Sequence, residues 1–126
     1  MVGGVNAAYP CPCCGYLQFD SPPGSYEICA ICFWEDDAVQ LLQPTFSGGA
    51  NRVSLLDAQR SYAAVGACEP RFVTSVRKPE TDDRRDPGFR PLHEHHDVLD
   101  VDDAVPLPSD RTLLYWWRPG RRSARA

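Results

Sequence analysis

The sequence predicts a small α+β fold, and two observations carry this expectation. Four cysteines follow the pattern C-x2-C-x14-C-x2-C, which is typical of two metal-binding turns joined by a short hairpin. Further along, one segment has the apolar spacing and the end signals of a helix. The chain of 126 residues also contains twelve prolines and nine glycines, so we expect the remaining elements to be a few short strands joined by loops.

The cysteine pattern predicts a zinc-ribbon-like hairpin. Residues 16–20 alternate apolar and polar side chains, as a half-buried strand does, and residues 26–29 return as a second strand. The segment 21–25 contains two prolines and a glycine, which favour a turn between the strands. We therefore expect this hairpin to join the first C-x2-C turn to the second.

The main helix is expected between Ser54 and Gly66. Serine is a favoured N-cap residue, and glycine is common just past a helix end. One face of this helix is apolar: Leu55, Ala58, Tyr62 and Val65. Residues 71–76 and 112–117 are interpreted as two further strands, and residues 43–49 and 78–90 as loops.

The four cysteines of the pattern are the expected ligands of one Zn²⁺: Cys11, Cys14, Cys29 and Cys32. Four thiolates close the coordination shell, so we expect the site to be structural. The same donors also bind iron, which we consider less favoured because no other feature indicates electron transfer. Cys13 lies between two ligands, where it replaces one of them, remains an inert thiol, or acts as a nucleophile beside the cation.

Two other groups are able to carry chemistry. Cys68 follows the helix end, where it is either a small core residue or a reactive thiol. The second group is an acidic run behind an aromatic residue: Trp34, Glu35, Asp36 and Asp37. This run forms an interaction surface or binds a hard cation, caps the segment that follows, or pairs internally with arginines at positions 77, 85 and 90.

The chain has three histidines, and they lie together at His93, His95 and His96. They do not form an H-E-x-x-H motif, because position 97 is Asp97. We expect a surface loop, with a second, weaker metal site as the alternative. The glycine pair at residues 48–49 either forms a tight turn or cradles an anion, and the missing P-loop lysine favours the turn.

Charge and hydropathy narrow the classes of partner. Thirteen basic and seventeen acidic residues give a net charge of −4, and residues 9–51 contain no Lys or Arg, which argues against nucleic-acid binding by the hairpin. No apolar run approaches the roughly 20 residues of a membrane span. The first eight residues also lack the features of a signal peptide. We expect a cytoplasmic protein whose cysteines bind metal rather than form disulfides.

We expect one zinc-stapled domain over residues 9–118. Residues 1–8 would form a flexible lead-in, and residues 119–126, which include three arginines, a basic and disordered tail. Within the domain, residues 9–92 would be the core and residues 93–118 a variable extension.

A set of further motifs accompanies the cysteines. They are Tyr9 to Tyr16 (YPCPCCGY), Gly24 to Cys29, Cys32 to Asp37, Gly48 to Asn51, Ser54-Leu55, Ala58-Gln59, Gly66 to Cys68, Arg77, Arg85 to Pro87 and Arg90 to Leu92. In this combination the chain resembles the bacterial cysteine-rich CPCC family over residues 9–92. The resemblance implies a zinc-binding protein of a family without an established activity.

These observations favour a small cytoplasmic zinc protein with a structural four-cysteine site that binds another protein, for example as an adaptor or a toxin-neutralising protein. An acidic body would complement a basic partner. The alternative is a small metalloprotein enzyme, a thiol- or carboxylate-based hydrolase that uses Cys13 or Cys68 with the acidic run.

Overall fold

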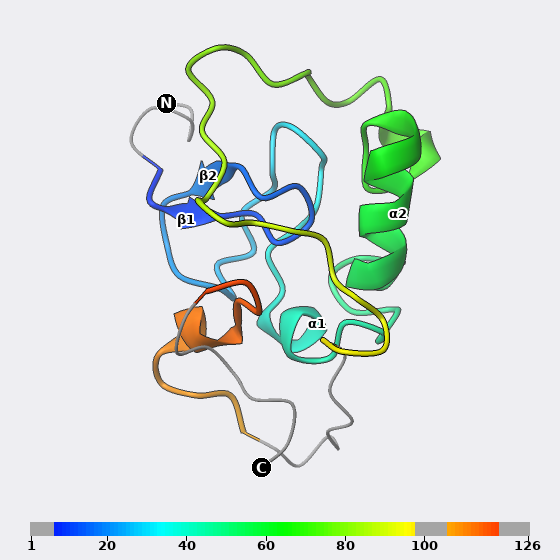
Figure 1. Ribbon diagram of the computed structural model, residues 1–126. Coiled ribbons are helices and arrows are strands. Elements are labelled where there is room, and N and C mark those ends of the chain that lie inside the picture. Colours follow the sequence, from blue (N-terminus) through cyan, green and yellow to red (C-terminus); the bar gives the residue numbers. More distant parts are fainter. Residues whose placement is uncertain (1–6, 98–105, 119–126) are drawn as a thin grey trace.

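A short sheet, two α-helices and two 3-10 helices make up the regular structure. The computed structural model describes residues 7–97 and 106–118, with the elements β1 (Tyr9–Pro10), β2 (Leu17–Phe19), α1 (Ala38–Leu42), α2 (Leu55–Val65), η1 (Pro70–Phe72) and η2 (Arg111–Leu114) (Figure 1). β1 and β2 form a two-stranded antiparallel sheet. A small α+β fold with one main helix is thereby confirmed.

No helix in the described ranges is long and apolar enough to cross a membrane. The expected tail at 119–126 and most of the expected lead-in lie outside the described residues.

The hairpin differs from the expected one. β2 pairs with β1, on the other side of the first C-x2-C turn, and not with residues 26–29. Those residues instead run antiparallel to residues 34–36, with an isolated bridge between Ile28 and Glu35. The expectation of one hairpin joining both turns was wrong, because each C-x2-C turn reverses the chain by itself and carries its own short hairpin.

A segment from the far half of the chain extends the first hairpin. Arg85 forms an antiparallel bridge with Tyr16. The backbone N–H of Leu17 donates to the C=O of residue 84, and the N–H of Asp86 donates to the C=O of Gly15, both at 2.8 Å. Residues 84–86, interpreted from sequence as part of a loop, therefore lie alongside the sheet (Figure 1).

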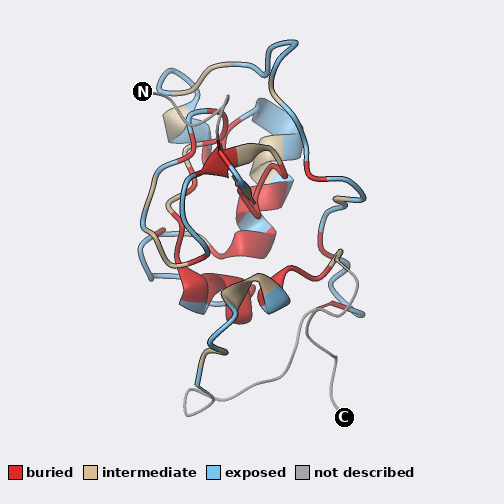
Figure 2. Ribbon diagram, turned by 90° about the vertical axis from the view of Figure 1, so that its left-hand side faces the viewer, coloured by how far each residue is buried: buried red, intermediate tan, exposed pale blue. Residues whose placement is uncertain are grey.

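The main helix, α2, is capped as the sequence predicts. The Ser54 hydroxyl accepts a bond of 3.1 Å from the backbone N–H three residues on, and Gly66 ends the helix with φ +84°. The buried residues of α2 are Leu55, Leu56, Ala58 and Gln59. Tyr62, also expected on this face, is half-buried against the core, whereas Val65 is 46% exposed, because the fully buried residues of α2 all lie in its first half (Figure 2).

The short helix α1 was not expected from the sequence. Its N-cap is Asp37, whose carboxylate accepts bonds from the N–H groups of Val39 (2.8 Å) and Gln40 (3.3 Å). A helix of five residues is too short for apolar periodicity to identify it. The sequence did contain one signal for α1, since capping of the following segment was among the roles considered for the acidic run.

The two strands expected in the C-terminal half are 3-10 helices instead. η1 begins with Pro70, whose fixed φ suits a first helical turn. η2 begins after Asp110, whose carboxylate accepts a bond of 3.1 Å from the N–H two residues on. η2 and the residues after it still deliver large side chains to the core: Leu114, Tyr115 and Trp116.

A carboxylate joins this C-terminal segment to the segment at 84–86. Asp86 accepts bonds from the indole N–H of Trp117 (2.7 Å) and from two guanidinium nitrogens of Arg118 (both 2.8 Å). Burial acts to raise the pKa of Asp86, but these donors outweigh burial and hold the pKa below its usual value. The ionised carboxylate therefore stabilises the fold.

We predict that Asp86→Asn lowers the free energy of unfolding by about 2–3 kcal/mol near neutral pH, since charge-assisted bonds are lost at a buried site. Because the folded-state pKa is lowered, this contribution is present above the unfolded-state pKa of about 4 and is lost as the pH falls through the folded-state value. Urea unfolding at several pH values measures it. The exposed control Asp82→Asn should change stability by less than about 0.5 kcal/mol, and equal effects of both variants would contradict the assignment.

Candidate metal centre

The four expected ligands converge on one point. The sulfur atoms of Cys11, Cys14, Cys29 and Cys32 all lie within 4.8 Å of one another, and all four residues are buried. The Cys11–Cys32 and Cys14–Cys29 sulfur pairs are 3.5 and 3.7 Å apart. A tetrahedral zinc site with Zn–S bonds of about 2.3 Å has sulfur–sulfur edges of about 3.8 Å. The donor set therefore fits a single tetrahedral cation.

The two cysteine turns share one backbone geometry. The residue after the second cysteine has a positive φ in both turns, +84° at Gly15 and +74° at Phe33. Its N–H donates to the C=O of the first cysteine, at 2.7 Å in the first turn and 2.9 Å in the second. The N–H of that first cysteine donates to the C=O five residues on, at 2.9 Å in both turns. Each turn thus presents two sulfurs on one side.

Only one of the two positive-φ positions is a glycine, and neighbouring aromatics explain the difference. A Cβ at Gly15 would lie 2.4 Å from the ring of Phe89, so this position requires glycine for space as well as for φ. Phe33 keeps its side chain at a strained φ and packs against Phe72, with ring centroids 4.5 Å apart.

Burial makes the isolated thiols poor acids. It raises the pKa of Cys11 and Cys32 well above the usual value and that of Cys14 to about 11. Burial acts in the same direction on Cys29, but bonds from the other three thiols and from the Cys32 N–H outweigh it and lower the pKa. A bound cation would supply the charge that stabilises all four sulfurs as thiolates.

Later segments hold the first turn in place. The side-chain amide of Gln59 donates to the C=O of Pro12, and the Nε of Arg85 donates to the C=O of Cys14, both at 2.8 Å. Sequence reasoning did not assign Gln59. The available signal was a polar residue on the apolar face of the main helix, since Gln59 is 6% exposed.

The second turn is held by the chain that follows α2. The N–H of Cys68 donates to the C=O of Cys32 at 2.7 Å, and the N–H of Arg77 donates to the C=O of Ala30 at 3.1 Å. Both turns therefore carry hydrogen bonds from residues far away in sequence, and the metal centre lies where these segments meet.

The structure leaves Cys13 and Cys68 outside the four-sulfur cluster. Both are buried, at 3% and 1% exposure. Burial is the largest cause that raises the pKa of Cys68, which keeps this thiol protonated. A reactive thiol has to be accessible to its reactant, so the burial of both side chains favours the inert reading of these residues.

The acidic run is internal. Trp34, Asp36 and Asp37 are 0%, 2% and 6% exposed, and only Glu35 of the run is partly exposed. The expected interaction surface is therefore wrong for three of its four residues. Asp36 accepts bonds from the hydroxyl (2.6 Å) and the N–H (3.3 Å) of Ser25.

The expected pairing of this run with arginines is also wrong. Arg77 binds Asp83 and Arg90 binds Asp97, with closest approaches of 2.7 and 2.6 Å. Asp37 uses its second oxygen to accept the N–H of residue 50 at 2.9 Å. Backbone N–H groups and the Ser25 hydroxyl, rather than guanidinium groups, donate to the buried carboxylates at positions 36 and 37.

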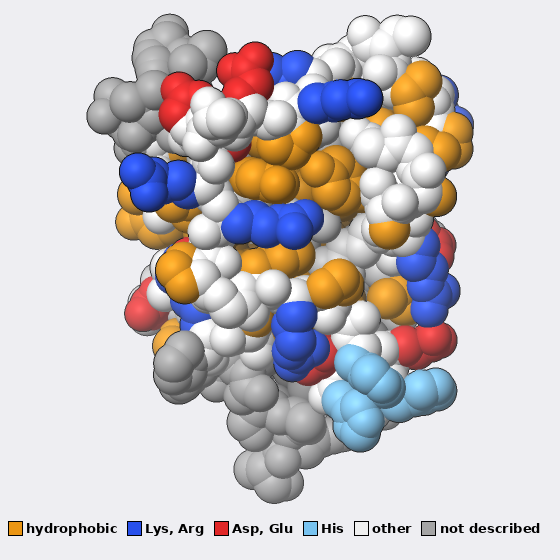
Figure 3. All heavy atoms as spheres, turned by 45° about the horizontal axis from the view of Figure 1, so that its top comes forward, with side chains coloured by type: hydrophobic (Ala, Val, Ile, Leu, Met, Phe, Trp, Pro, Cys, Tyr) orange, Lys and Arg blue, Asp and Glu red, His pale blue; other side chains and the backbone are white. Residues whose placement is uncertain are grey.

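The histidines lie together at the surface, at one margin of the face in Figure 3. The ring centroids of His93 and His96 are 4.2 Å apart, and those of His93 and His95 are 6.0 Å apart. Within the described ranges, however, the cysteine cluster is the one group of three or more metal-ligating atoms close enough to share an ion. The glycine pair lies in a bend at residues 48–50, where Gly48 has a φ of +86° and a Cβ at Gly49 would lie 2.7 Å from the Asp37 carboxylate.

We predict that Cys14→Ala abolishes binding of one metal ion per chain, whereas Cys13→Ala and Cys68→Ala retain it, because only Cys14 belongs to the converging set. Metal analysis of each purified variant measures the stoichiometry. If Cys13→Ala lost the metal and Cys14→Ala kept it, the ligand assignment would be wrong.

The buried Asp36 carboxylate gives a second prediction. Burial is the largest cause that raises its pKa from 3.8 to about 6. A raised folded-state pKa makes the ionised form destabilising, by roughly 3 kcal/mol above pH 6, and this penalty disappears as the pH falls toward 4. The oxygen of an asparagine side chain accepts the same two bonds from Ser25. We expect Asp36→Asn to be more stable than the parent at pH 7, and its advantage to fall by about half at pH 5.

Chemical unfolding with metal in excess measures this difference. Asp20→Asn, at an exposed position of the same region, is the matched control and should be neutral within about 0.5 kcal/mol. An Asp36→Asn variant less stable than the parent at pH 7 would show that the ionised carboxylate stabilises the fold.

Comparison with known proteins agrees with the cysteine geometry. None of the curated proteins matches this chain. The family model described as Cysteine-rich CPCC matches residues 9–83, a range that contains all six cysteines of the sequence. Residues 84–92, which the sequence resemblance also included, lie beyond this match. Since the match covers more than half of the 126 residues, the chain belongs to the cysteine-rich CPCC family.

Proposed function

We propose that this chain is a cytoplasmic zinc protein in which a structural four-cysteine site holds together a scaffold that binds another protein. The closed donor set is the observation that carries this proposal. Four buried cysteines supply four sulfurs, and a cation that they bind has no remaining position for a substrate. A closed site of this kind stabilises a fold instead of activating water.

Zinc is favoured over iron by the surroundings of the site. Thiolates bind both metals, but an electron-transfer iron site needs contact with a redox partner. All four ligands here are 0% exposed. Zn²⁺ has no redox chemistry and requires only the tetrahedral set of donors.

Protein is favoured over nucleic acid as the partner. The first 51 residues of the chain contain no Lys or Arg, although they form both cysteine turns. Nucleic-acid interfaces are strongly positive. An acidic chain with exposed apolar side chains, among them Tyr26 (58%) and Ile28 (52%), is better suited to a protein surface with basic residues at its rim. An adaptor or toxin-neutralising role draws no specific support from the described residues.

Metal substitution tests the structural site. We expect the purified protein to contain one zinc per chain, and its Co²⁺ form to show the intense absorption of a tetrahedral thiolate site. Stripping the metal with a strong chelator should unfold the domain, because metal-binding energy contributes directly to folding of such sites. A protein that contains iron, or one that keeps its cooperative unfolding transition after stripping, would contradict the proposal.

Affinity capture tests the partner class. Metal-loaded protein, treated with nuclease, should retain a protein from native lysate at low salt and release it near 1 M salt, where the Debye length falls to about 3 Å. Chelator-stripped protein is the control and should retain nothing specific. Retention that requires nucleic acid, or that persists equally on stripped protein, would overturn this part of the proposal.

A further inference from the structure

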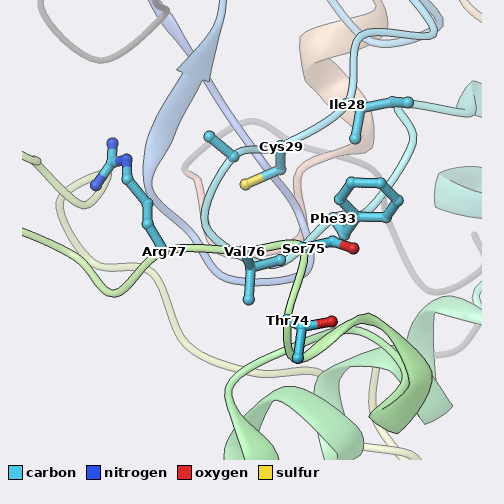
Figure 4. A pocket seen from close by; sticks show the side chains of 8 residues that line it. Ile28, Cys29, Phe33, Thr74, Ser75, Val76 and Arg77 are labelled. Carbon is cyan, nitrogen blue, oxygen red and sulfur yellow. The ribbon is translucent and has the colours of Figure 1, made fainter.

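We infer that a groove beside the second cysteine turn binds an extended segment of another protein as an added β-strand. This inference rests on the proposed function and deepens it by naming the surface and the class of partner. The groove has a volume of about 440 Å³ and lies between residues 28–30 and residues 74–77 (Figure 4). Pockets that hold small ligands span roughly 300–1,000 Å³, so a few residues of a peptide fit.

One wall of the groove carries an unpaired strand edge. Ile28 and Glu35 face each other as a non-hydrogen-bonded pair, because the two flanking bonds, both 2.9 Å, come from the residues on either side of them. In such a pair each residue points its own N–H and C=O away from its partner strand. The outward groups of Ile28 therefore form a template for another strand.

The other edge of the Ile28–Glu35 pair, that of Glu35, is already bonded to a side chain in the way that a neighbouring strand would be. The side-chain amide of Asn51 accepts the N–H of Glu35 at 2.9 Å and donates to its C=O at 2.8 Å, as a neighbouring strand would. Within the described residues, the corresponding groups of Ile28 have no hydrogen-bond partner. One edge of this ladder is covered by a side chain, and the other is open.

The second wall starts to pair with the first and then diverges into a turn. The N–H of Arg77 donates to the C=O of Ala30 at 3.1 Å, and the groove opens beyond this bond. Residues 73–75 form a turn, in which the N–H of Ser75 donates to the C=O of Phe72 at 2.8 Å. A strand inserted here would form its backbone bonds with the Ile28 edge and pack its side chains against this second wall.

The side chains around the groove favour apolar residues in the bound strand. Figure 4 shows Ile28 beside the ring of Phe33 at one end, with Val76 from the facing segment. Because every second side chain of a strand points to the same side, a bound strand with alternate apolar residues would place them here.

Backbone strain supports a recognition role for this region. Tyr26, two residues before Ile28, adopts a positive φ of +61°, which costs a bulky residue of order 1 kcal/mol or more. Tyr26 is 58% exposed, so burial in this chain does not account for an aromatic residue at that position. An aromatic side chain held at the surface is available for contact with a partner.

A different protein is favoured over a second copy as the occupant. A second copy would have to insert an extended segment of its own, and the strands of the described chain are two and three residues long and already paired with each other. An isologous contact between two Ile28 edges would leave the space beside residues 74–76 unfilled.

Peptide selection followed by titration tests this inference. Metal-loaded protein is panned against a phage library of random linear heptapeptides, and the most enriched peptide is synthesised and titrated into ¹⁵N-labelled protein. We expect enriched sequences with alternate apolar residues. The amide signals of Ile28 and Val76 should shift, and hydrogen exchange at Ile28 should slow by at least tenfold. A peptide N-methylated at its central amides should bind at least tenfold more weakly.

The matched variants are Ile28→Lys and Val65→Lys, which replace aliphatic side chains of 52% and 46% exposure. Both should retain one metal ion and the parent unfolding transition. Ile28→Lys should weaken peptide binding at least tenfold, and Val65→Lys should change it less than twofold.

Binding unaffected by Ile28→Lys would overturn the groove assignment but leave a protein-binding function standing. If no peptide is enriched, the strand-binding inference fails, and affinity capture still decides whether the chain binds a protein through another surface. Sedimentation that reveals a dimer dissociated by Ile28→Lys would make a second copy the occupant.

Discussion

The fold depends on four buried sulfurs that converge on one point, where they would share one cation. Regular hydrogen bonding among the described residues is sparse, since the sheet has strands of two and three residues and α2 contributes eleven residues, of which the buried ones all lie in the first half. Burial alone would leave most of the thiols protonated. A cation bound where both cysteine turns meet would stabilise the four sulfurs as thiolates and so offset this cost. The hydrogen bonds from Cys68, Arg77, Arg85 and Asp86 to these turns then place the second half of the chain around the same centre.

Local signals in the sequence were reliable, and signals that depend on distant contacts were not. The C-x2-C spacing predicted the cluster because the geometry of each turn is set within six residues, and α2 was predicted by its own caps. The strand pairing failed because each cysteine turn pairs the residues that flank it, and the place of residues 84–86 beside the first hairpin was missed because they are far away in sequence. The acidic run was misjudged for a related reason. Nothing in its own composition indicates that Ser25 and residue 50 will supply donors to Asp36 and Asp37.

A closed metal site has no coordination position for a ligand, so binding would take place at the surface that the site supports. The second cysteine turn places Ile28 and Phe33 on one wall of the groove, and the bond from Arg77 to Ala30 fixes the other wall. The metal centre and the proposed strand-binding edge are therefore parts of one unit. In the proposed arrangement the metal would act on binding through structure alone, by holding the second cysteine turn and the Ile28–Glu35 bridge in place.

Amide hydrogen exchange with and without chelator tests the central claim most directly. The protons to follow are those of Leu17 and Asp86 at the first turn and of Cys68 and Arg77 at the second, since each donates a backbone bond that depends on the position of a cysteine turn. If one cation organises the whole domain, all four lose protection together when the metal is removed and regain it when zinc is restored. Protection that survives in the metal-free protein, or that is lost at one turn and kept at the other, would contradict this account.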